Sequence, residues 1–315
     1  MSLSSIPRIL ILDNDETTGS YYLLFYLYDF LAKSSLNGKL NANKTFRVLL
    51  KEFDKLKVFR PGLRTFLKSM NALKESGKID KVCIYTNQLD VRGIPGYKVL
   101  TTVDGGDKRE WSVPDMLRVL FNMIVKDSGF VDAVYTRPVA YNVQEEYPTK
   151  DFVRVFRDLY PDMDVNLTYT MFVDDRFHRK YIIDSSRSET DENSRIPIEP
   201  YRVTLPSNSF SEVLNAILRA NKLVLHHDSK LRNTIEDGWI DMNERVSLIG
   251  KEPSNSNIES FGNLKSLGLY LTQFYLSKEN TNSISQTRRN GKKRGSSNNT
   301  IKRAKNQRGK SQRRY

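Results

Sequence analysis

Apolar runs that stop abruptly at polar residues recur along the chain. Three of them are rich in β-branched or aromatic residues and cover residues 6–12, 81–85 and 167–173. Continuous apolar runs of this length are typical of strands that are buried on both faces of a sheet. The sequence therefore predicts three buried strands, each followed directly by polar residues.

Between and after these strands, apolar residues recur with the spacing of an amphipathic helix. The predicted helices cover residues 18–33, 61–76, 114–126, 149–160, 210–221 and 264–276. Strands that alternate with helices indicate an α/β fold with a parallel sheet and helices on both faces. Because the carboxyl ends of parallel strands meet at one crevice, the polar residues after the strands are expected to share a ligand site.

Pattern and composition divide the chain into a domain, an extension and a tail. The α/β domain is predicted over residues 1–228, with an inserted loop or small cap over the crevice at residues 88–112, a stretch rich in Gly, Asp and Lys. The helical pattern weakens after about residue 228, and residues 229–280 are predicted as a helical extension. Residues 281–315 are rich in Ser, Asn, Lys and Arg and are predicted to be disordered.

The positive charge of the chain lies in the tail. The whole sequence has a formal net charge of +13, whereas residues 281–315 contain twelve Lys or Arg and no Asp or Glu, so residues 1–280 carry +1. Because residues 1–280 are nearly neutral, their charge gives no reason to expect a nucleic-acid-binding surface on this part of the chain.

The single cysteine, Cys83, excludes an intramolecular disulfide and a cysteine-rich zinc site. We expect it to be a small buried residue of the second strand. The N-terminus lacks the basic region of a signal peptide, and the apolar residues 21–32 are too few to span a bilayer. These features predict an intracellular protein, nuclear or cytoplasmic, with no membrane partner.

The residues after the first strand carry the clearest chemical signal. Asp13 and Asp15 stand two positions apart directly past the strand end. Two such carboxylates can converge on one hard cation, since Mg²⁺ prefers oxygen ligands, and a carboxylate can also attack phosphorus as a nucleophile. Taken alone, a pair like this is more often a solvated turn, so the other strand ends decide the interpretation.

Four motifs in chain order resemble those of the haloacid dehalogenase (HAD) superfamily. They are Asp13-x-Asp15-Glu16-Thr17, a strand ending at Thr86, Lys150 with Asp151, and a strand ending at Asp174-Asp175. Within the superfamily, the sequence is similar to the branch of the RNA polymerase II carboxy-terminal-domain phosphatases and the NLI-interacting-factor-like phosphatases. That similarity includes Arg60-Pro61-Gly62 with Phe66-Leu67 ahead of the second motif, and it covers about residues 8–205.

The resemblance implies a HAD-like Rossmannoid fold and an Mg²⁺-dependent phosphatase that works through an aspartyl-phosphate. By that resemblance, Asp13 is the nucleophile, and Asp15 is the general acid that later activates water. Lys150 would neutralise the phosphate and the nucleophile's carboxylate. Phosphoryl transfer mainly requires positioning and charge neutralisation, so these few groups are chemically sufficient.

The same resemblance implies where the phosphate and the metal bind. The substrate phosphate is expected at Thr86 and Asn87, together with Lys150. The expected Mg²⁺ ligands are Asp13, Asp15, Asp174 and Asp175. Adjacent carboxylates repel each other, and a cation is the simplest explanation for both Asp174 and Asp175.

Two basic clusters in the tail resemble a bipartite nuclear localisation signal and favour a nuclear protein. The same charges would also neutralise the phosphates of a nucleic acid. The tail is therefore expected to contact nucleic acid or an import receptor, and the alternative is a solvated segment that only aids solubility. The clusters consist of Arg288, Arg289, Lys292, Lys293 and Arg294, followed by Lys302, Arg303 and Lys305.

The expected substrate is a phosphoserine- or phosphothreonine-containing protein, which follows from the branch resembled. A nucleic-acid-end phosphatase is the alternative, because a basic tail that binds polyanions would help such an enzyme directly to reach its substrate. A catalytically dead HAD scaffold tethered to nucleic acid is the remaining alternative. The retained Asp13, Asp15, Lys150 and Asp174 argue against a dead site, since a scaffold has no need to hold repelling carboxylates together.

Overall fold

The computed structural model describes residues 7–92, 94–137, 152–162, 169–175, 195–225, 228–249 and 261–276. The chain divides into two compact units, Met1–Gln273 and Phe274–Tyr315, and all labelled elements belong to the first. Lys150 and the predicted disordered tail lie outside the described residues.

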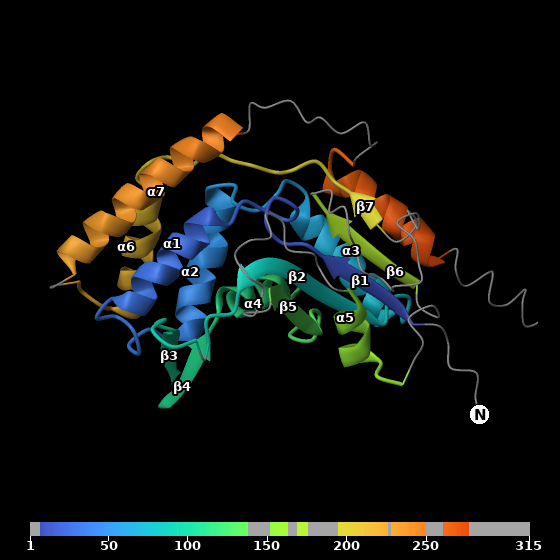
Figure 1. Cartoon of the computed structure of the whole chain (residues 1–315), viewed down its shortest axis with the longest axis horizontal. Helices are drawn as coiled ribbons and strands as arrows, with labels where there is room; N and C mark the ends of the chain where they lie inside the picture. Colours follow the sequence, from blue (N-terminus) through green and yellow to red (C-terminus); the bar gives the residue numbers. More distant parts are fainter. Residues whose placement is uncertain are drawn as a thin grey trace, which may run out of the picture. The chain divides into compact units, whose positions relative to one another are not determined.

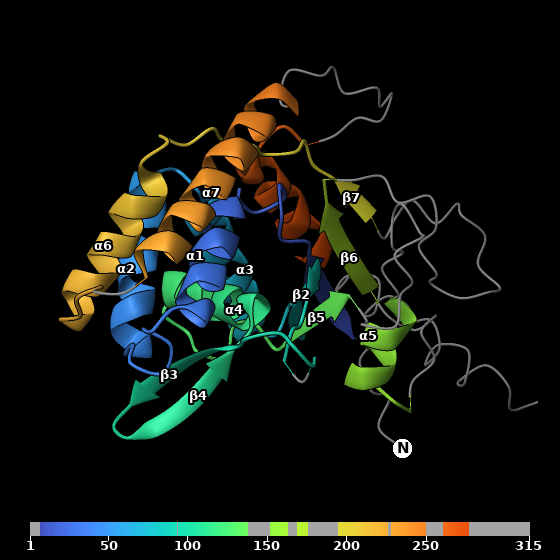
Figure 2. The ribbon, with the colours of Figure 1, turned by 60° about the vertical axis from the view of Figure 1, so that its left-hand side comes forward.

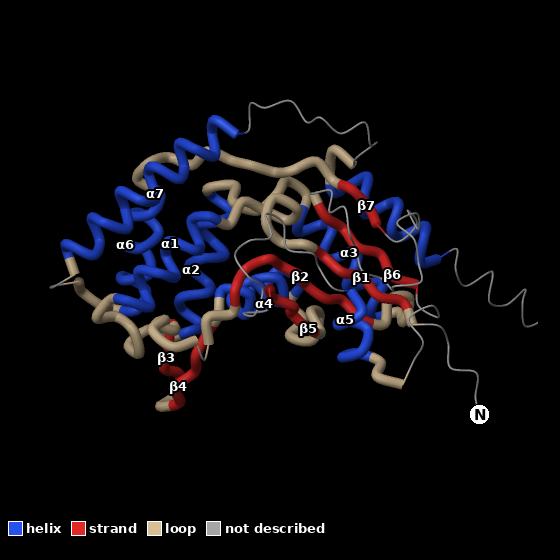
Figure 3. The backbone as a smooth tube through the Cα atoms, in the orientation of Figure 1, coloured by secondary structure: helices blue, strands red, loops and turns tan. Residues whose placement is uncertain are grey.

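Five parallel strands form one sheet in the order β5-β2-β1-β6-β7 (Figure 1). The strands are β1 (Arg8–Leu12), β2 (Lys81–Leu89), β5 (Ala133–Arg137), β6 (Tyr169–Asp174) and β7 (Arg195–Pro197). The predicted α/β fold with a parallel sheet is confirmed, and its topology is compatible with a Rossmann-like fold. The three strands predicted from apolar runs are the three central ones, and Figure 3 shows them side by side.

Helices cover both faces of this sheet. They are α3 (Leu63–Glu75), α4 (Val113–Val125) and α5 (Phe152–Leu159). On one face, alternate residues of the central strands, among them Ile9, Cys83 and Phe172, pack with Val155 of α5. The intervening strand residues are equally buried, and α4 packs along β2 and β5 and against α3. Burial on both faces explains why these strands read as continuous apolar runs.

Four further helices form a second helical layer. They are α1 (Tyr22–Lys33), α2 (Ala42–Lys55), α6 (Ser209–Asn221) and α7 (Ser229–Ile249). The helices α1 and α2 follow β1 directly, whereas α6 and α7 come after β7, yet α1 packs against α7 and α2 against α6 (Figure 2). Two distant chain segments are therefore held together by this layer.

The sequence pattern did not predict α2, and it predicted α7 only as part of the helical extension over residues 229–280. Helix α2 has a clear start, since the Asn41 side chain accepts a hydrogen bond from the Lys44 amide at 2.9 Å, and Phe46, Leu49 and Phe53 are buried on one face. Helix α7 contains Gly238 in its middle, which weakens its helical pattern. A Cβ at that position would lie 3.3 Å from the Tyr26 ring, so the glycine allows α7 to approach α1 closely.

The predicted insertion at residues 88–112 contains an antiparallel hairpin of β3 (Leu100–Asp104) and β4 (Asp107–Trp111). Its turn, Gly105-Gly106, has positive φ at both residues, as the type I′ hairpin turn requires. The hairpin is attached to the α1–α2 connection, because the Val103 amide donates to the Leu40 carbonyl at 2.8 Å. Its Trp111 ring also lies edge-on to Phe46 of α2, with the ring centroids 4.8 Å apart.

Residues 264–276 are helical, as predicted. A Cβ on Gly268 would lie 3.5 Å from the ring of Phe66, so this helix packs against α3. Just before it, Phe261 forms a parallel bridge with Ile198, beyond the end of β7. Among the described residues, no helix is both long and apolar enough to cross a membrane.

The environment of Cys83 predicts an unreactive thiol. The residue is completely buried in β2, and burial raises the pKa of its thiol to about 12. Because the thiolate is the reactive form, the native protein should not react with Ellman's reagent, whereas the denatured chain should release one equivalent of coloured product. Rapid reaction of the folded protein would contradict the predicted packing.

Candidate metal centre

The strand register brings three chain segments to one edge of the sheet. Leu12, the last residue of β1, pairs with Ile84 of β2 on one side and with Val173 of β6 on the other. The Asp13 amide continues this pairing by donating to the Val173 carbonyl at 2.9 Å. The residues after these positions therefore emerge together at the carboxyl edge, where open α/β sheets bind ligands.

Three carboxylates meet at this edge. Oxygens of Asp13, Asp174 and Asp175 all lie within 4.8 Å of one another. Asp13 is 6% exposed and Asp174 is completely buried. Three converging carboxylate oxygens form a donor set suited to a hard cation such as Mg²⁺, so this group could bind a metal ion.

The electrostatics of the group favour a bound cation. Burial, together with the nearby carboxylates of Asp13, Asp174 and Glu16, raises the pKa of Asp175 to about 9, although a hydrogen bond from Thr17 lowers it. Both main causes penalise the charged form of the carboxyl group. A divalent cation would remove the repulsion and allow all three carboxylates to ionise.

The hydroxyl of Thr17 links two of these carboxylates. Its Oγ1 lies 3.1 Å from Oδ2 of Asp13 and 2.9 Å from Oδ1 of Asp175, and it accepts a hydrogen bond from the Asp175 amide at 3.0 Å. A hydroxyl has a single proton, so it can donate fully to only one carboxylate at a time. Thr17 therefore fixes the spacing of Asp13 and Asp175 without neutralising both.

The side chain of Asp15, predicted as a fourth metal ligand, lies outside the group of three. Its Oδ2 instead accepts a hydrogen bond from the side-chain amide of Gln88, at 3.1 Å. The local backbone explains the difference, because Asp15 forms a bridge with Gly19 and Glu16 has a left-handed φ of 60°. This turn directs the two aspartates of the motif to different partners.

The left-handed residue Glu16 is held by a charged clamp. Its carboxylate is 2% exposed and accepts two hydrogen bonds from Arg202, each 2.8 Å long, and a third from the hydroxyl of Tyr22 at 2.7 Å. The Glu16 carbonyl also accepts from the Tyr201 amide. The segment after β7 is thereby tied to the loop that carries Asp13 and Asp15.

The arginine of the Arg-Pro-Gly motif supports the same loop. Arg60 is buried, and its guanidinium donates to the carbonyls of Thr17 (3.1 Å) and Glu199. Burial lowers the pKa of Arg60, while Asp175 and Glu199 oppose the shift. The motif itself was visible in the sequence, but the contributions of Glu199 and Arg202 were not, since no local pattern marks them.

The predicted phosphate-binding residues are described only in part. Thr86 is buried two residues past Ile84, the last residue of β2 that pairs with β1, and β2 continues beyond it to Leu89 rather than ending there as predicted. The Oγ1 of Thr86 accepts a hydrogen bond from the Gln88 amide at 3.1 Å. Asn87 follows it in β2, but its side chain lies outside the described residues, as does Lys150. The structure thus brings Asp13, Asp174 and Asp175 together, and Thr86 follows two residues after the Leu12–Ile84 pair in the neighbouring strand.

Comparison of the chain with protein-family models, with curated proteins and with solved structures found no match. The function therefore has to be inferred from the residues of the site and from the motifs that they form.

The clamp on Glu16 predicts a large stability difference between two arginine substitutions. Arg202→Ala removes the partner of a buried carboxylate and should lower the free energy of unfolding by about 3 kcal/mol. The matched control is Arg245→Ala, whose ion pair with Asp241 lies 3.0 Å apart at side-chain exposures of 67% and 62%. An exposed pair of this kind is worth about 0.5 kcal/mol.

Urea denaturation of both variants measures the difference. Similar losses for Arg202→Ala and Arg245→Ala would contradict the role of the clamp.

Proposed function

We propose that the protein is an Mg²⁺-dependent phosphatase of the HAD type that hydrolyses phosphomonoesters through an aspartyl-phosphate on Asp13. The proposal rests mainly on the group of Asp13, Asp174 and Asp175 at the carboxyl edge of a parallel sheet. Asp13 belongs both to this donor set and to the motif that resembles the HAD nucleophile. A solvated turn would not bury such carboxylates together.

In the first step, the carboxylate of Asp13 attacks phosphorus, and the bond between phosphorus and the leaving oxygen breaks. Asp15 gives its proton to the leaving oxygen, so the products are an alcohol and the aspartyl-phosphate. In the second step, Asp15 takes a proton from water, which attacks phosphorus and releases inorganic phosphate and the Asp13 carboxylate. The protein supplies positioning and charge neutralisation for both steps.

The proposed Mg²⁺ ligands are the carboxylates of Asp13, Asp174 and Asp175. A bound Mg²⁺ would neutralise the charge that develops on the phosphoryl oxygens. Thr86, buried in β2 two residues past the position that pairs with Leu12, would donate its hydroxyl and amide protons to the phosphate. Lys150 is proposed to add a positive charge at the same phosphate.

A phosphoserine- or phosphothreonine-containing protein is the proposed substrate. The second candidate is the phosphorylated end of a nucleic acid, favoured by the twelve cationic residues of the tail, which would attract a polyanion. Nucleic acid or an import receptor is the proposed partner of the tail, with the nucleus as the proposed location. Rates of hydrolysis of three substrates distinguish these alternatives: a generic aryl phosphate, a phosphoserine peptide and an end-phosphorylated oligonucleotide.

Substitution of the two motif aspartates tests the mechanism. Asp13→Asn should lower turnover of 4-nitrophenyl phosphate by roughly 10³-fold or more, because the nucleophile is lost. Asp15→Asn should also abolish turnover, yet it should still form the phosphoenzyme with this ester, whose leaving group needs little protonation. Intact-protein mass spectrometry detects the trapped phosphoryl group as added mass on Asp15→Asn, and this mass should be absent from Asp13→Asn.

Asp241→Asn is the control, since Asp241 lies exposed on α7, and it should keep wild-type turnover. Wild-type rates for Asp13→Asn would contradict the assignment of the nucleophile. A wild-type protein that binds Mg²⁺ but hydrolyses none of the three substrates would instead support the catalytically dead scaffold.

A further inference from the structure

We propose that Gln88 is a positioning residue for this reaction: its side-chain amide orients the carboxyl group of Asp15 for proton transfer. This inference rests on the proposed function, which assigns the proton to Asp15. Gln88 lies outside the four motifs that the sequence resembles. The central observation is its Nε2 donating to Oδ2 of Asp15 at 3.1 Å, across a separation of 73 residues.

An irregularity in β2 brings the Gln88 side chain to this place. Tyr85 pairs with Tyr135 of β5, but the next pair is Leu89 with Arg137, so β2 uses two more residues than β5 over the same interval. Such a bulge redirects the side chains of the extra residues, and bulges are frequent beside active sites. Residues 86–88 occupy the bulge, directly where β2 reaches the carboxyl edge.

The backbone of Gln88 is fixed by the neighbouring site residue. Its amide donates to Oγ1 of Thr86 at 3.1 Å, within the bulge. Thr86 is completely buried, so this hydrogen bond ties Gln88 to a residue that cannot move independently of the sheet. The proposed phosphate-binding threonine and the residue that holds Asp15 are therefore parts of one rigid turn.

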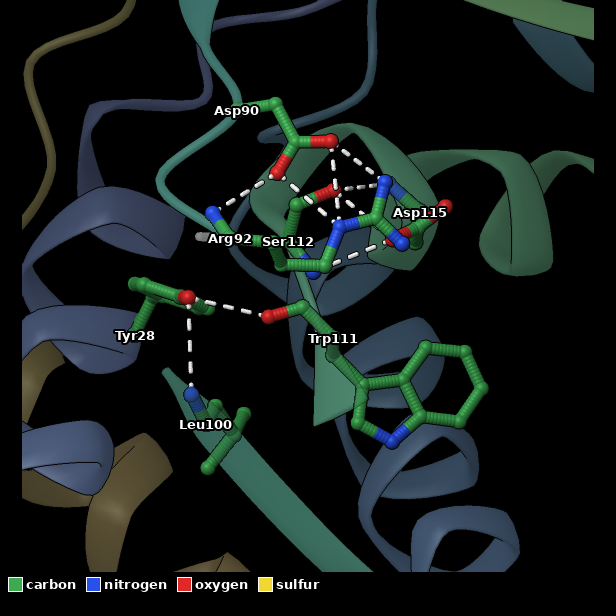
Figure 4. Close-up of polar contacts among 7 residues, drawn as sticks. All are labelled: Tyr28, Asp90, Arg92, Leu100, Trp111, Ser112 and Asp115. Carbon is green, nitrogen blue, oxygen red and sulfur yellow. Dashed lines mark hydrogen bonds and ion pairs between the residues drawn. The ribbon is translucent and has the colours of Figure 1, made fainter. Parts of the chain in front are cut away.

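Ion pairs and hydrogen bonds among Asp90, Arg92, Ser112 and Asp115 hold the chain just beyond Gln88 (Figure 4). The Arg92 guanidinium lies between two carboxylates: it donates to Asp90, and its Nη1 is 2.9 Å from Oδ2 of Asp115. Burial raises the pKa of Asp90, but the hydrogen bonds from Arg92 outweigh it and hold that pKa below its ordinary value. Asp115 also forms the capping box of α4 with Ser112. The segment after the bulge is thus fastened to the start of a core helix.

A second set of hydrogen bonds holds the C-terminal end of the 88–112 segment. The Tyr28 hydroxyl of α1 donates to the Trp111 carbonyl at 2.9 Å and accepts from the Leu100 amide at 3.4 Å, as Figure 4 shows. Both ends of the 88–112 segment are therefore bound to helices of the domain, by ion pairs at one end and by hydrogen bonds at the other. A glutamine on a segment fixed at both ends can hold its partner in one orientation, which a freely moving loop residue cannot do.

The hydrogen bond has a direct chemical consequence for Asp15. An amide proton donated to Oδ2 leaves Oδ1 as the oxygen that carries the transferable proton. As the bond between phosphorus and the leaving oxygen breaks, that proton moves from Oδ1 to the leaving oxygen. Loss of the amide would allow the carboxyl group to rotate, so that fewer substrate encounters find the proton correctly placed.

Leaving-group dependence provides the test. Phenyl phosphate needs a proton on its leaving oxygen, whereas 2,4-dinitrophenyl phosphate does not. Gln88→Met has similar length without the amide, and Gln88→Glu has the same shape without the donors. Both should lower kcat/KM for phenyl phosphate by roughly tenfold or more, a part of what general acid catalysis contributes. Both should leave kcat/KM for 2,4-dinitrophenyl phosphate within about twofold, because kcat/KM reports formation of the phosphoenzyme and excludes the later step in which Asp15 activates water.

The same substitution at an exposed glutamine, Gln273→Met, is the matched control and should change neither rate. Equal losses of kcat/KM on both esters would overturn the proposal, because they would show a structural role only. Unchanged kcat/KM on both esters would overturn it as well. A wild-type protein inactive on both esters would refute the proposed function itself, and the role of Gln88 with it.

Discussion

Repulsion among carboxylates is the constraint on which the rest of the site depends. The ends of β1 and β6 place Asp13, Asp174 and Asp175 within 4.8 Å of one another, largely removed from water. Ionised carboxylates so close together destabilise the fold unless a cation or a proton compensates them. The raised pKa of Asp175, at about 9, expresses this cost. A divalent cation would remove this cost, so the three carboxylates could bind a metal ion.

The surroundings of the site keep it rigid without cancelling that charge. Arg60 and Arg202 both approach the Asp13–Thr17 loop, yet Arg60 donates to backbone carbonyls and Arg202 pairs with Glu16. Gly19 closes the loop in a place where a Cβ would lie 2.8 Å from the Val58 carbonyl oxygen. The cationic side chains thus hold the shape of the loop, and the acidic group stays open to a metal ion. Rigid support of this kind keeps the three carboxylates in a fixed arrangement.

The central sheet was predictable from the sequence because burial on both faces leaves a continuous apolar signal, as in the residues around Ile9 and Cys83. The outer strand β7 has only three residues and left no such signal. Gly238 weakened the pattern of α7, which was predicted only as part of a longer helical extension. The meeting of Asp13 with Asp174 and Asp175 was predicted from their places after strands. The different partner of Asp15 was not, since it depends on a left-handed Glu16 and on a bulge in β2 that aims Gln88 across the site. Such features arise from tertiary packing, which local patterns do not encode.

Metal binding measured by electron paramagnetic resonance tests the central claim most directly. Mn²⁺ takes the same oxygen ligands as Mg²⁺, and its free signal falls when it binds. The full-length protein should bind one Mn²⁺ per chain, and excess Mg²⁺ should displace it. Asp174→Asn should weaken binding by roughly tenfold or more, a loss expected when a charged ligand becomes neutral. Equal Mn²⁺ affinity in the wild type and in Asp174→Asn, or no binding by either, would contradict the account.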